Sequence, residues 1–110
     1  MERLFTLVAR RVVVENHSML PTLVPGERLT AVRKWRRVRV GDVVVVRDPR
    51  ERERWIIKRC VARRRGLLDL RGDNPAVSSD SRDFGPVPAR AVPYLVVGLG
   101  PSKGRPTTVR

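Results

Sequence analysis

The sequence predicts one all-β domain of short, bent antiparallel strands. The chain has 110 residues with nine prolines and eight glycines, and short valine-rich runs lie between these turn formers. A chain of this length supports a single hydrophobic core. Proline and glycine at this density interrupt helices, whereas runs of β-branched residues favour strands. We expect residues 1–99 to form this domain and residues 100–110 to be a flexible basic tail.

Apolar runs bounded by turn residues define the individual strands. The charged run at 50–54 is expected to be a solvated loop, and residues 63–66, which read Arg-Arg-Arg-Gly, a hairpin turn. The expected strands cover residues 12–14, 28–32, 38–40, 43–46, 55–62, 67–70 and 94–99.

The strand at 55–62 carries a lysine in an unusual place. Alternation puts Lys58 on one face with Ile56, Cys60 and Ala62, where it is the only charged side chain. Burial disfavours the ammonium form and lowers a lysine pKa. Lys58 is therefore either an amine tuned to act as a base or a side chain whose head reaches water at a sheet edge. The alternation by itself leaves both interpretations open.

Charge and composition exclude some functions. The net charge is +13, and 21 of the 24 basic residues are arginines scattered along the chain. With only 5% aromatic residues and no nucleic-acid motif, we do not expect nucleic-acid binding, while an acidic partner or peripheral contact with an anionic membrane stays open. One cysteine and one histidine predict no disulfide, no metal site and no cofactor.

No segment is long and apolar enough to cross a bilayer. The longest uncharged stretch, residues 91–102, has 12 residues and contains two prolines, against the ~20 apolar residues that a spanning helix needs. The single Cys60 suits a reducing compartment. These observations predict a soluble cytoplasmic protein without a membrane anchor.

Three segments bring together residues that carry chemistry. Residues 18–23 read Ser-Met-Leu-Pro-Thr-Leu, residues 57–59 read Ile-Lys-Arg, and residues 72–82 read Gly-Asp-Asn-Pro-Ala-Val-Ser-Ser-Asp-Ser-Arg. Each has an ordinary structural interpretation, because serine often precedes a turn and an Asp–Arg pair on a surface contributes little. A serine becomes a good nucleophile only when a base takes its proton, and a buried lysine is such a base.

In this order and spacing the three segments resemble the signal peptidase I family of serine proteases. The resemblance implies the signal-peptidase and LexA-like fold, reduced here to a minimal catalytic core. It also implies that Ser18 is the nucleophile, that its backbone N–H belongs to the oxyanion hole and that Lys58 is the general base. Asn16 departs from the small residue usual at its position, and its amide is a candidate second donor to the oxyanion. His17, next to the nucleophile, is taken as a neighbour of the substrate cleft or a bystander, because adjacent strand residues face opposite ways.

The third segment carries further implied roles. In the family pattern Ser78 orients the lysine amine, and Asp80 and Arg82 form an ion pair that holds the loop. The remaining positions that match the pattern are assigned structural support: Gly72, Asp73 and Asn74.

The resemblance is strongest to the short group of nickel-type superoxide dismutase maturation proteases. It implies removal of an N-terminal propeptide from the nickel superoxide dismutase precursor. We expect the substrate to bind as an extended strand beside residues 14–16, because backbone pairing at a sheet edge positions a scissile bond without demanding particular side chains. Two alternatives stay open: a LexA-type self-cleaving domain, and a catalytically inactive basic binding module on the same scaffold.

Overall fold

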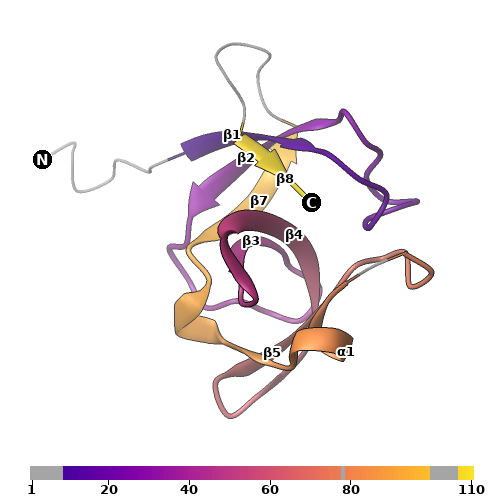
Figure 1. Ribbon diagram of the computed structural model, residues 1–110. Coiled ribbons are helices and arrows are strands. Elements are labelled where there is room, and N and C mark those ends of the chain that lie inside the picture. Colours follow the sequence, from indigo (N-terminus) through magenta and orange to yellow (C-terminus); the bar gives the residue numbers. More distant parts are fainter. Residues whose placement is uncertain (1–8, 78, 100–106) are drawn as a thin grey trace, which may run out of the picture.

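Eight strands hydrogen-bond into one sheet within residues 9–77, 79–99 and 107–110, the parts of the chain that the computed structural model describes. The spatial order is β6-β5-β4-β3-β7-β2-β1-β8, and every pairing is antiparallel except that of β1 with β8 (Figure 1). The strands are β1 (Ala9–Val14), β2 (Arg28–Arg33), β3 (Val43–Asp48), β4 (Glu51–Arg64), β5 (Leu67–Arg71), β6 (Val87–Pro88), β7 (Tyr94–Leu99) and β8 (Thr107–Val109). The expected all-β fold is confirmed.

Helical structure among the described residues is limited to one turn of α-helix, α1 (Ser81–Phe84), and a 3₁₀ turn at Ala89–Ala91. The side chain of Asp80 caps α1 by accepting a hydrogen bond from the N–H of Arg82, and Asp83 reaches back to the N–H of Asp80. This reciprocal capping box stabilises so short a helix.

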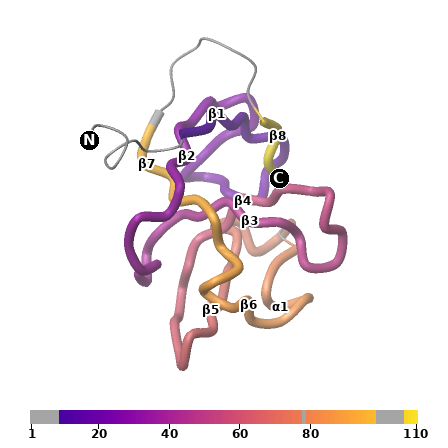
Figure 2. Tube along the Cα trace, turned by 90° about the vertical axis from the view of Figure 1, so that its left-hand side faces the viewer, coloured from indigo at the N-terminus to yellow at the C-terminus, as the bar shows by residue number. Residues whose placement is uncertain are grey.

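The sheet is strongly curled (Figures 1 and 2). Apolar side chains are buried on both faces of β3 and β4. Val44 and Val46 pack with Ile56 in one core cluster, whereas Val45 and Ile57 pack in the other. A strand buried on both sides reads as a continuous apolar run rather than an alternating one. The four consecutive valines of β3 are explained in this way.

A tight turn at Arg65 and Gly66 joins β4 to β5. Both residues have positive φ, 53° and 77°, as a two-residue hairpin turn of type I′ requires. The expected hairpin at 63–66 is confirmed, although its outer residues belong to β4.

The strand expected at 38–40 is wrong. Val38 is buried in the core, but the chain turns immediately after it. The carboxylate of Asp42 accepts a hydrogen bond from the N–H of Arg39 at 2.7 Å, and the N–H of Asp42 donates to the carbonyl of Arg39 at 3.0 Å. These local bonds close a turn and take the main-chain groups that a strand would offer to a neighbour.

The solvated loop expected at 50–54 is also wrong over most of its length, because β4 begins at Glu51. The turn is confined to Pro49 and Arg50, where the carboxylate of Asp48 accepts from the N–H of Arg50 at 2.8 Å. Charged side chains at 51–53 are exposed, so they do not oppose strand pairing through the backbone.

The flexible tail expected at 100–110 is corrected at its end. Residues 107–109 form β8, which pairs in parallel with β1, and Val109 is fully buried. The remainder of that range, residues 100–106, lies outside the described residues. This segment forms a strand despite its polar, basic composition, because the edge of β1 offers main-chain hydrogen bonds and the core offers an apolar site for Val109.

Candidate active site

Lys58 lies in the middle of β4, opposite Val44 of β3, and its side chain is only 2% exposed. Ile56 and Cys60, two residues away on either side, are buried in the same core cluster, as the alternation in the sequence predicted. Ala62, expected on this face, is exposed because the pairing of β4 with β5 shifts register between Cys60 and Ala62.

Burial lowers the pKa of Lys58 from 10.5 to about 8, although the nearby Asp80 and Asp48 carboxylates act in the opposite direction. Arg50 lowers it further through charge repulsion. At neutral pH a measurable fraction of this amine is therefore unprotonated, which an exposed lysine does not offer. The amine donates a hydrogen bond to the main-chain oxygen of Arg110 at 3.3 Å.

Asp80 is fully buried and anchors the loop beside Lys58. Burial alone raises the pKa of its carboxyl, but hydrogen bonds from the Arg82 side chain and from the N–H groups of Gly72 and Arg82 bring the pKa down to about 2. The Asp80–Arg82 ion pair measures 2.7 Å, and the Gly72 N–H lies 3.0 Å from the carboxylate. Asp80 thus stays ionised and adds negative charge near the amine.

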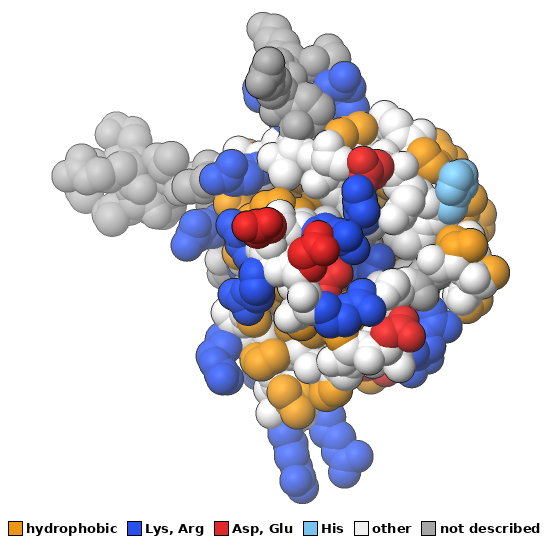
Figure 3. Space-filling model, in the orientation of Figure 1, with side chains coloured by type: hydrophobic (Ala, Val, Ile, Leu, Met, Phe, Trp, Pro, Cys, Tyr) orange, Lys and Arg blue, Asp and Glu red, His pale blue; other side chains and the backbone are white. Residues whose placement is uncertain are grey.

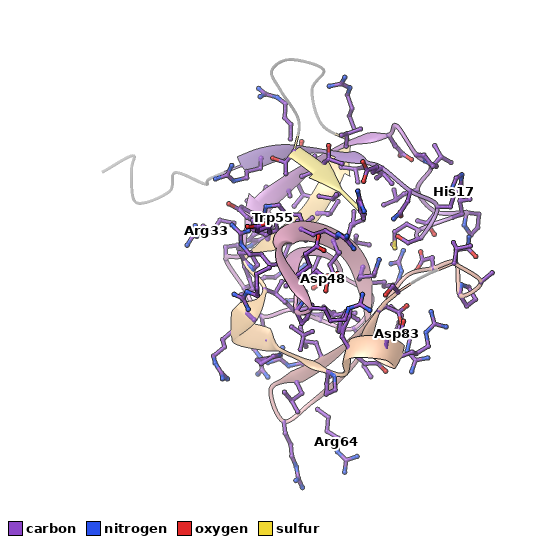
Figure 4. The ribbon with its side chains drawn as sticks, viewed as in Figure 1. His17, Arg33, Asp48, Trp55, Arg64 and Asp83 are labelled. Atoms are coloured by element: carbon purple, nitrogen blue, oxygen red, sulfur yellow. The ribbon has the colours of Figure 1, made fainter. Side chains whose placement is uncertain are left out.

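Asp48 is a second buried carboxylate near Lys58, and sequence reasoning missed it. Burial raises the pKa of Asp48, but hydrogen bonds and charge from Arg50, with Arg54 nearby, leave the pKa below its usual value. Figure 4 shows Asp48 in the middle of the curl formed by β3 and β4. The only signal in the sequence was an acidic residue two positions after a run of valines, which the Asp-Pro turn already explained.

Ser18 lies in the loop after β1 and is 2% exposed. Its carbonyl accepts a hydrogen bond from the N–H of Asn74 at 2.9 Å. Its own N–H donates to Oδ1 of Asn16 at 3.1 Å. The N–H of Ser18 is the donor expected to stabilise the oxyanion, but in this conformation it is engaged with the Asn16 side chain. It can serve the oxyanion only after this hydrogen bond is broken.

His17 is exposed, and Figure 4 shows its ring at the outer edge of the molecule, away from Asp48. Its carbonyl accepts a hydrogen bond from Nδ2 of Asn74 at 3.1 Å. The main chain of His17, rather than its imidazole, therefore connects to the rest of the site.

Asp73 links three parts of the chain through hydrogen bonds. Its carboxylate receives two parallel bonds of 2.9 Å from the guanidinium of Arg59 and one of 2.6 Å from the hydroxyl of Thr22. Arg59 also donates to the carbonyl of Gly41 at 2.8 Å. The loop at 72–74 therefore joins the Ser18 segment to the strand that carries Lys58. The roles of Arg59 and Thr22 were not apparent from the sequence, because each depends on a partner far along the chain.

Two further residues of interest are Ser78 and Cys60. Ser78 lies outside the described residues. Cys60 is buried, and burial raises the pKa of its thiol, so it belongs to the core. Within the described part of the chain, no group of three or more His, Cys, Asp or Glu side chains could hold a metal ion.

A cavity of about 310 Å³ lies beside β8 and the start of β4. Glu15, Glu51 and Glu53 line it together with the side chains of Arg54 and Arg110. Figure 3 shows acidic side chains surrounded by basic ones on this face. This cavity is therefore bordered by carboxylates, even though the whole chain is strongly basic.

Comparison with known protein families identifies the class of protein to which this all-β fold and candidate site belong. Residues 3–63 match the family model described as signal peptidase, peptidase S26. The chain belongs to the peptidase S26 family.

One curated relative is the mitochondrial ATP-independent inner membrane protease subunit 1a of Arabidopsis thaliana, which is 33% identical to this chain. The alignment covers 68% of this chain and 60% of the relative. None of the helices described in this chain has the length and apolar character needed to cross a membrane.

Proposed function

We propose that this chain is a serine endopeptidase in which Ser18 is the nucleophile and Lys58 the general base. The observation that carries the proposal is the buried amine of Lys58, whose pKa is lowered to about 8 in a family of peptidases. The lysine lies on a rigid central strand, and Ser18 lies on a loop tied to the same strand through Asn74, Asp73 and Arg59. A base with a pKa near the working pH is the most effective one.

In this mechanism the neutral amine of Lys58 takes the proton of the Ser18 hydroxyl while Oγ attacks the carbonyl carbon of the scissile peptide bond. The resulting ammonium returns the proton to the leaving amine, and an acyl-enzyme forms. Water then attacks the acyl group and gives a proton to Lys58, which passes it to Oγ of Ser18 as the ester bond breaks and the new carboxyl end is released. The Ser18 N–H, with Asn16 as a candidate second donor, stabilises the oxyanion once the bond between them is exchanged.

The supporting residues have separate tasks in this proposal. Asp80 and Arg82 hold the loop that contains Ser78, and Ser78 orients the lysine amine. Ser78→Ala should therefore lower kcat more than it raises KM. Equal kinetics of Ser78→Ala and wild type would remove this role.

The substrate class is a protein precursor that loses an N-terminal segment in the cytoplasm, bound as an extended strand along β1. The resemblance of residues 72–85 to the nickel superoxide dismutase maturation proteases supports the nickel superoxide dismutase precursor as that substrate. The match to the Arabidopsis membrane protease supports proteolysis of proteins in general.

The decisive experiment incubates the purified chain with the candidate precursor and maps new N-termini by mass spectrometry. Ser18→Ala and Lys58→Ala should each abolish cleavage, and the double variant should be no worse than either, because the two residues act as one unit. Continued cleavage by Lys58→Ala would contradict the proposed base. A time-dependent loss of mass by the chain alone would favour the self-cleaving alternative, and folded protein that cleaves nothing would favour the binding module.

A further inference from the structure

Strand β8 is the edge strand next to β1 (Figures 1 and 2), and Arg110, which follows it directly, forms main-chain hydrogen bonds with β4. On one side it runs parallel to β1, and the N–H of Glu15 donates to the carbonyl of Val109 at 2.8 Å. On the other side, the N–H of Arg110 donates to Trp55 at 3.1 Å, and the N–H of Ile57 donates to Arg110 at 2.8 Å. An extended peptide added to a sheet is held in this way.

The segment leads directly to the candidate base. The main-chain oxygen of Arg110 that accepts from Ile57 also accepts from the amine of Lys58 at 3.3 Å. A peptide substrate has to place a main-chain carbonyl near the serine and lysine for attack. Here a main-chain oxygen of the chain itself lies within hydrogen-bond distance of that lysine.

The side chains of the segment alternate between a core site and the surface. Val109 is fully buried in the core cluster that contains Val14, Met19 and Ile57, whereas Thr108 is exposed. The guanidinium of Arg110 forms an ion pair with Glu15 at the edge of the carboxylate-lined cavity. Backbone pairing, one buried aliphatic side chain and one ion pair together hold the segment in its groove.

We propose that residues 107–110 are a resident competitor of the substrate: they occupy the groove between β1 and β4, and a substrate strand binds only after they leave. The inference rests on the proposed function, because it takes this groove to be the substrate site. A tethered competitor acts at a high effective concentration. It raises the apparent KM in proportion to the population ratio of chains with the segment bound to chains with the groove open. The rate of the chemical step is unchanged.

The test compares a substitution at the buried position of the segment with one at its exposed neighbour. Val109→Asp places a carboxylate in an apolar site and should expel the segment. Thr108→Asn is the control, because it changes an exposed side chain without adding a charge to the carboxylate-lined cavity that Thr108 borders. With a fluorogenic peptide substrate, Val109→Asp should lower KM at least ~10-fold with kcat within ~2-fold of wild type. Thr108→Asn should behave as wild type. An unchanged or raised KM for a folded Val109→Asp variant would overturn the inference.

A deletion of residues 107–110 provides a second variant, and circular dichroism establishes that each variant is folded. The deletion variant should also be inhibited competitively by the synthetic peptide Thr-Thr-Val-Arg added in trans. Lack of inhibition at millimolar peptide would count against a groove that recognises this segment.

Amide hydrogen exchange separates a failure of this inference from a failure of the proposed function. The N–H groups of Glu15 and Ile57 bond to the segment, so in the full chain they should exchange slowly, and in the deletion variant rapidly. Added Thr-Thr-Val-Arg should restore their protection. If neither chain cleaves any peptide, the proposed function fails while this result still supports occupancy. Rapid exchange of both amides in the full chain would overturn the inference whether or not the protein is a protease.

Discussion

At the scale of single residues, the chemistry of this site depends on the balance of charge around Lys58. Burial lowers its pKa, while two buried carboxylates, Asp80 and Asp48, raise it. Each carboxylate is held ionised by its own arginines. The pKa of Lys58 near 8 is therefore the net result of these opposing effects, and a substitution at either carboxylate should shift it.

Asp48→Asn should shift the ascending limb of the kcat/KM profile to lower pH by up to about one unit, because it removes a negative charge that favours the ammonium form. The asparagine oxygen still accepts the N–H of Arg50, so the turn is kept. The measurement is the pH–rate profile with a peptide substrate. Asp42→Asn is the matched control, because Asp42 pairs with Arg36 and does not affect the pKa of Lys58. A shift to higher pH, or the same shift in both variants, would contradict this account.

Lys58→Met should stabilise the fold at neutral pH while abolishing activity. The folded-state pKa of about 8 lies below 10.5, so between these values the unfolded chain binds more protons and wild-type stability rises with pH. Below pH 8 the buried ammonium costs about 3 kcal/mol, which methionine avoids. Urea unfolding should show a gain of this order at pH 7 that shrinks toward pH 10.5. An equal difference between wild type and variant at both pH values would mean that Lys58 is not a desolvated amine.

At the scale of elements, the site depends on a loop that joins two distant segments. Residues 72–74 bond to the carbonyls of His17 and Ser18 through Asn74 and to β4 through Asp73 and Arg59. The short helix α1 follows, capped by Asp80, whose carboxylate also accepts from Gly72. One loop thus sets the position of the serine relative to the strand of the lysine.

Asp73→Ala should lower the free energy of unfolding by ~2 kcal/mol, because it leaves the partly buried Arg59 without its paired carboxylate and Thr22 without an acceptor. Because the serine loop is then held less firmly, kcat should fall as well. Chemical denaturation and peptide hydrolysis measure the two effects. Asp69→Ala removes a more exposed ion pair with Arg71 and should change stability by less than ~0.5 kcal/mol. Similar losses in both variants would show that Asp73 acts only as a surface charge.

At the scale of the whole molecule, acid should unfold this protein readily. The pKa values of Asp42, Asp48, Asp73 and Asp80 are lowered in the fold, that of Asp80 to about 2. Their stabilisation is present above the unfolded value near 3.8 and is lost as the pH falls toward the folded values. Protonation also raises a net charge that is already +13 at pH 7, which increases repulsion within the folded state.

Tryptophan fluorescence followed from pH 5 to pH 1.5 should therefore show cooperative unfolding in the window between about 4 and 2. Added salt should move the midpoint to lower pH by screening the positive charges. In Asp80→Asn the dependence on pH in this window should be weaker, because the strongest of the shifted carboxyls is gone. Stability that stays constant down to pH 2 would contradict the assigned ion pairs.

The sequence by itself determined the fold class, most of the strands and the placement of Lys58 on an apolar face. Each follows from local rules: β-branched runs pair as strands, glycine and proline end them, and alternation separates the two faces of a strand. The segments around Ser18, Lys58 and Asp80 were likewise recognisable, because their spacing is written along the chain.

Only the tertiary structure decided which groups surround the amine. Asp48 comes near Lys58 because it lies inside the curl that β3 and β4 form. Asp73 bonds to Arg59 and Thr22, which come from distant parts of the chain. Residues 107–110 have the composition of a tail, yet residues 107–109 form β8 and Arg110 bonds to β4, because β1 and β4 offer main-chain partners and an apolar site that buries Val109. The physical reason is that backbone hydrogen bonding accepts almost any residue, so the available edge, and not the pattern of the segment, determines which strand lies there.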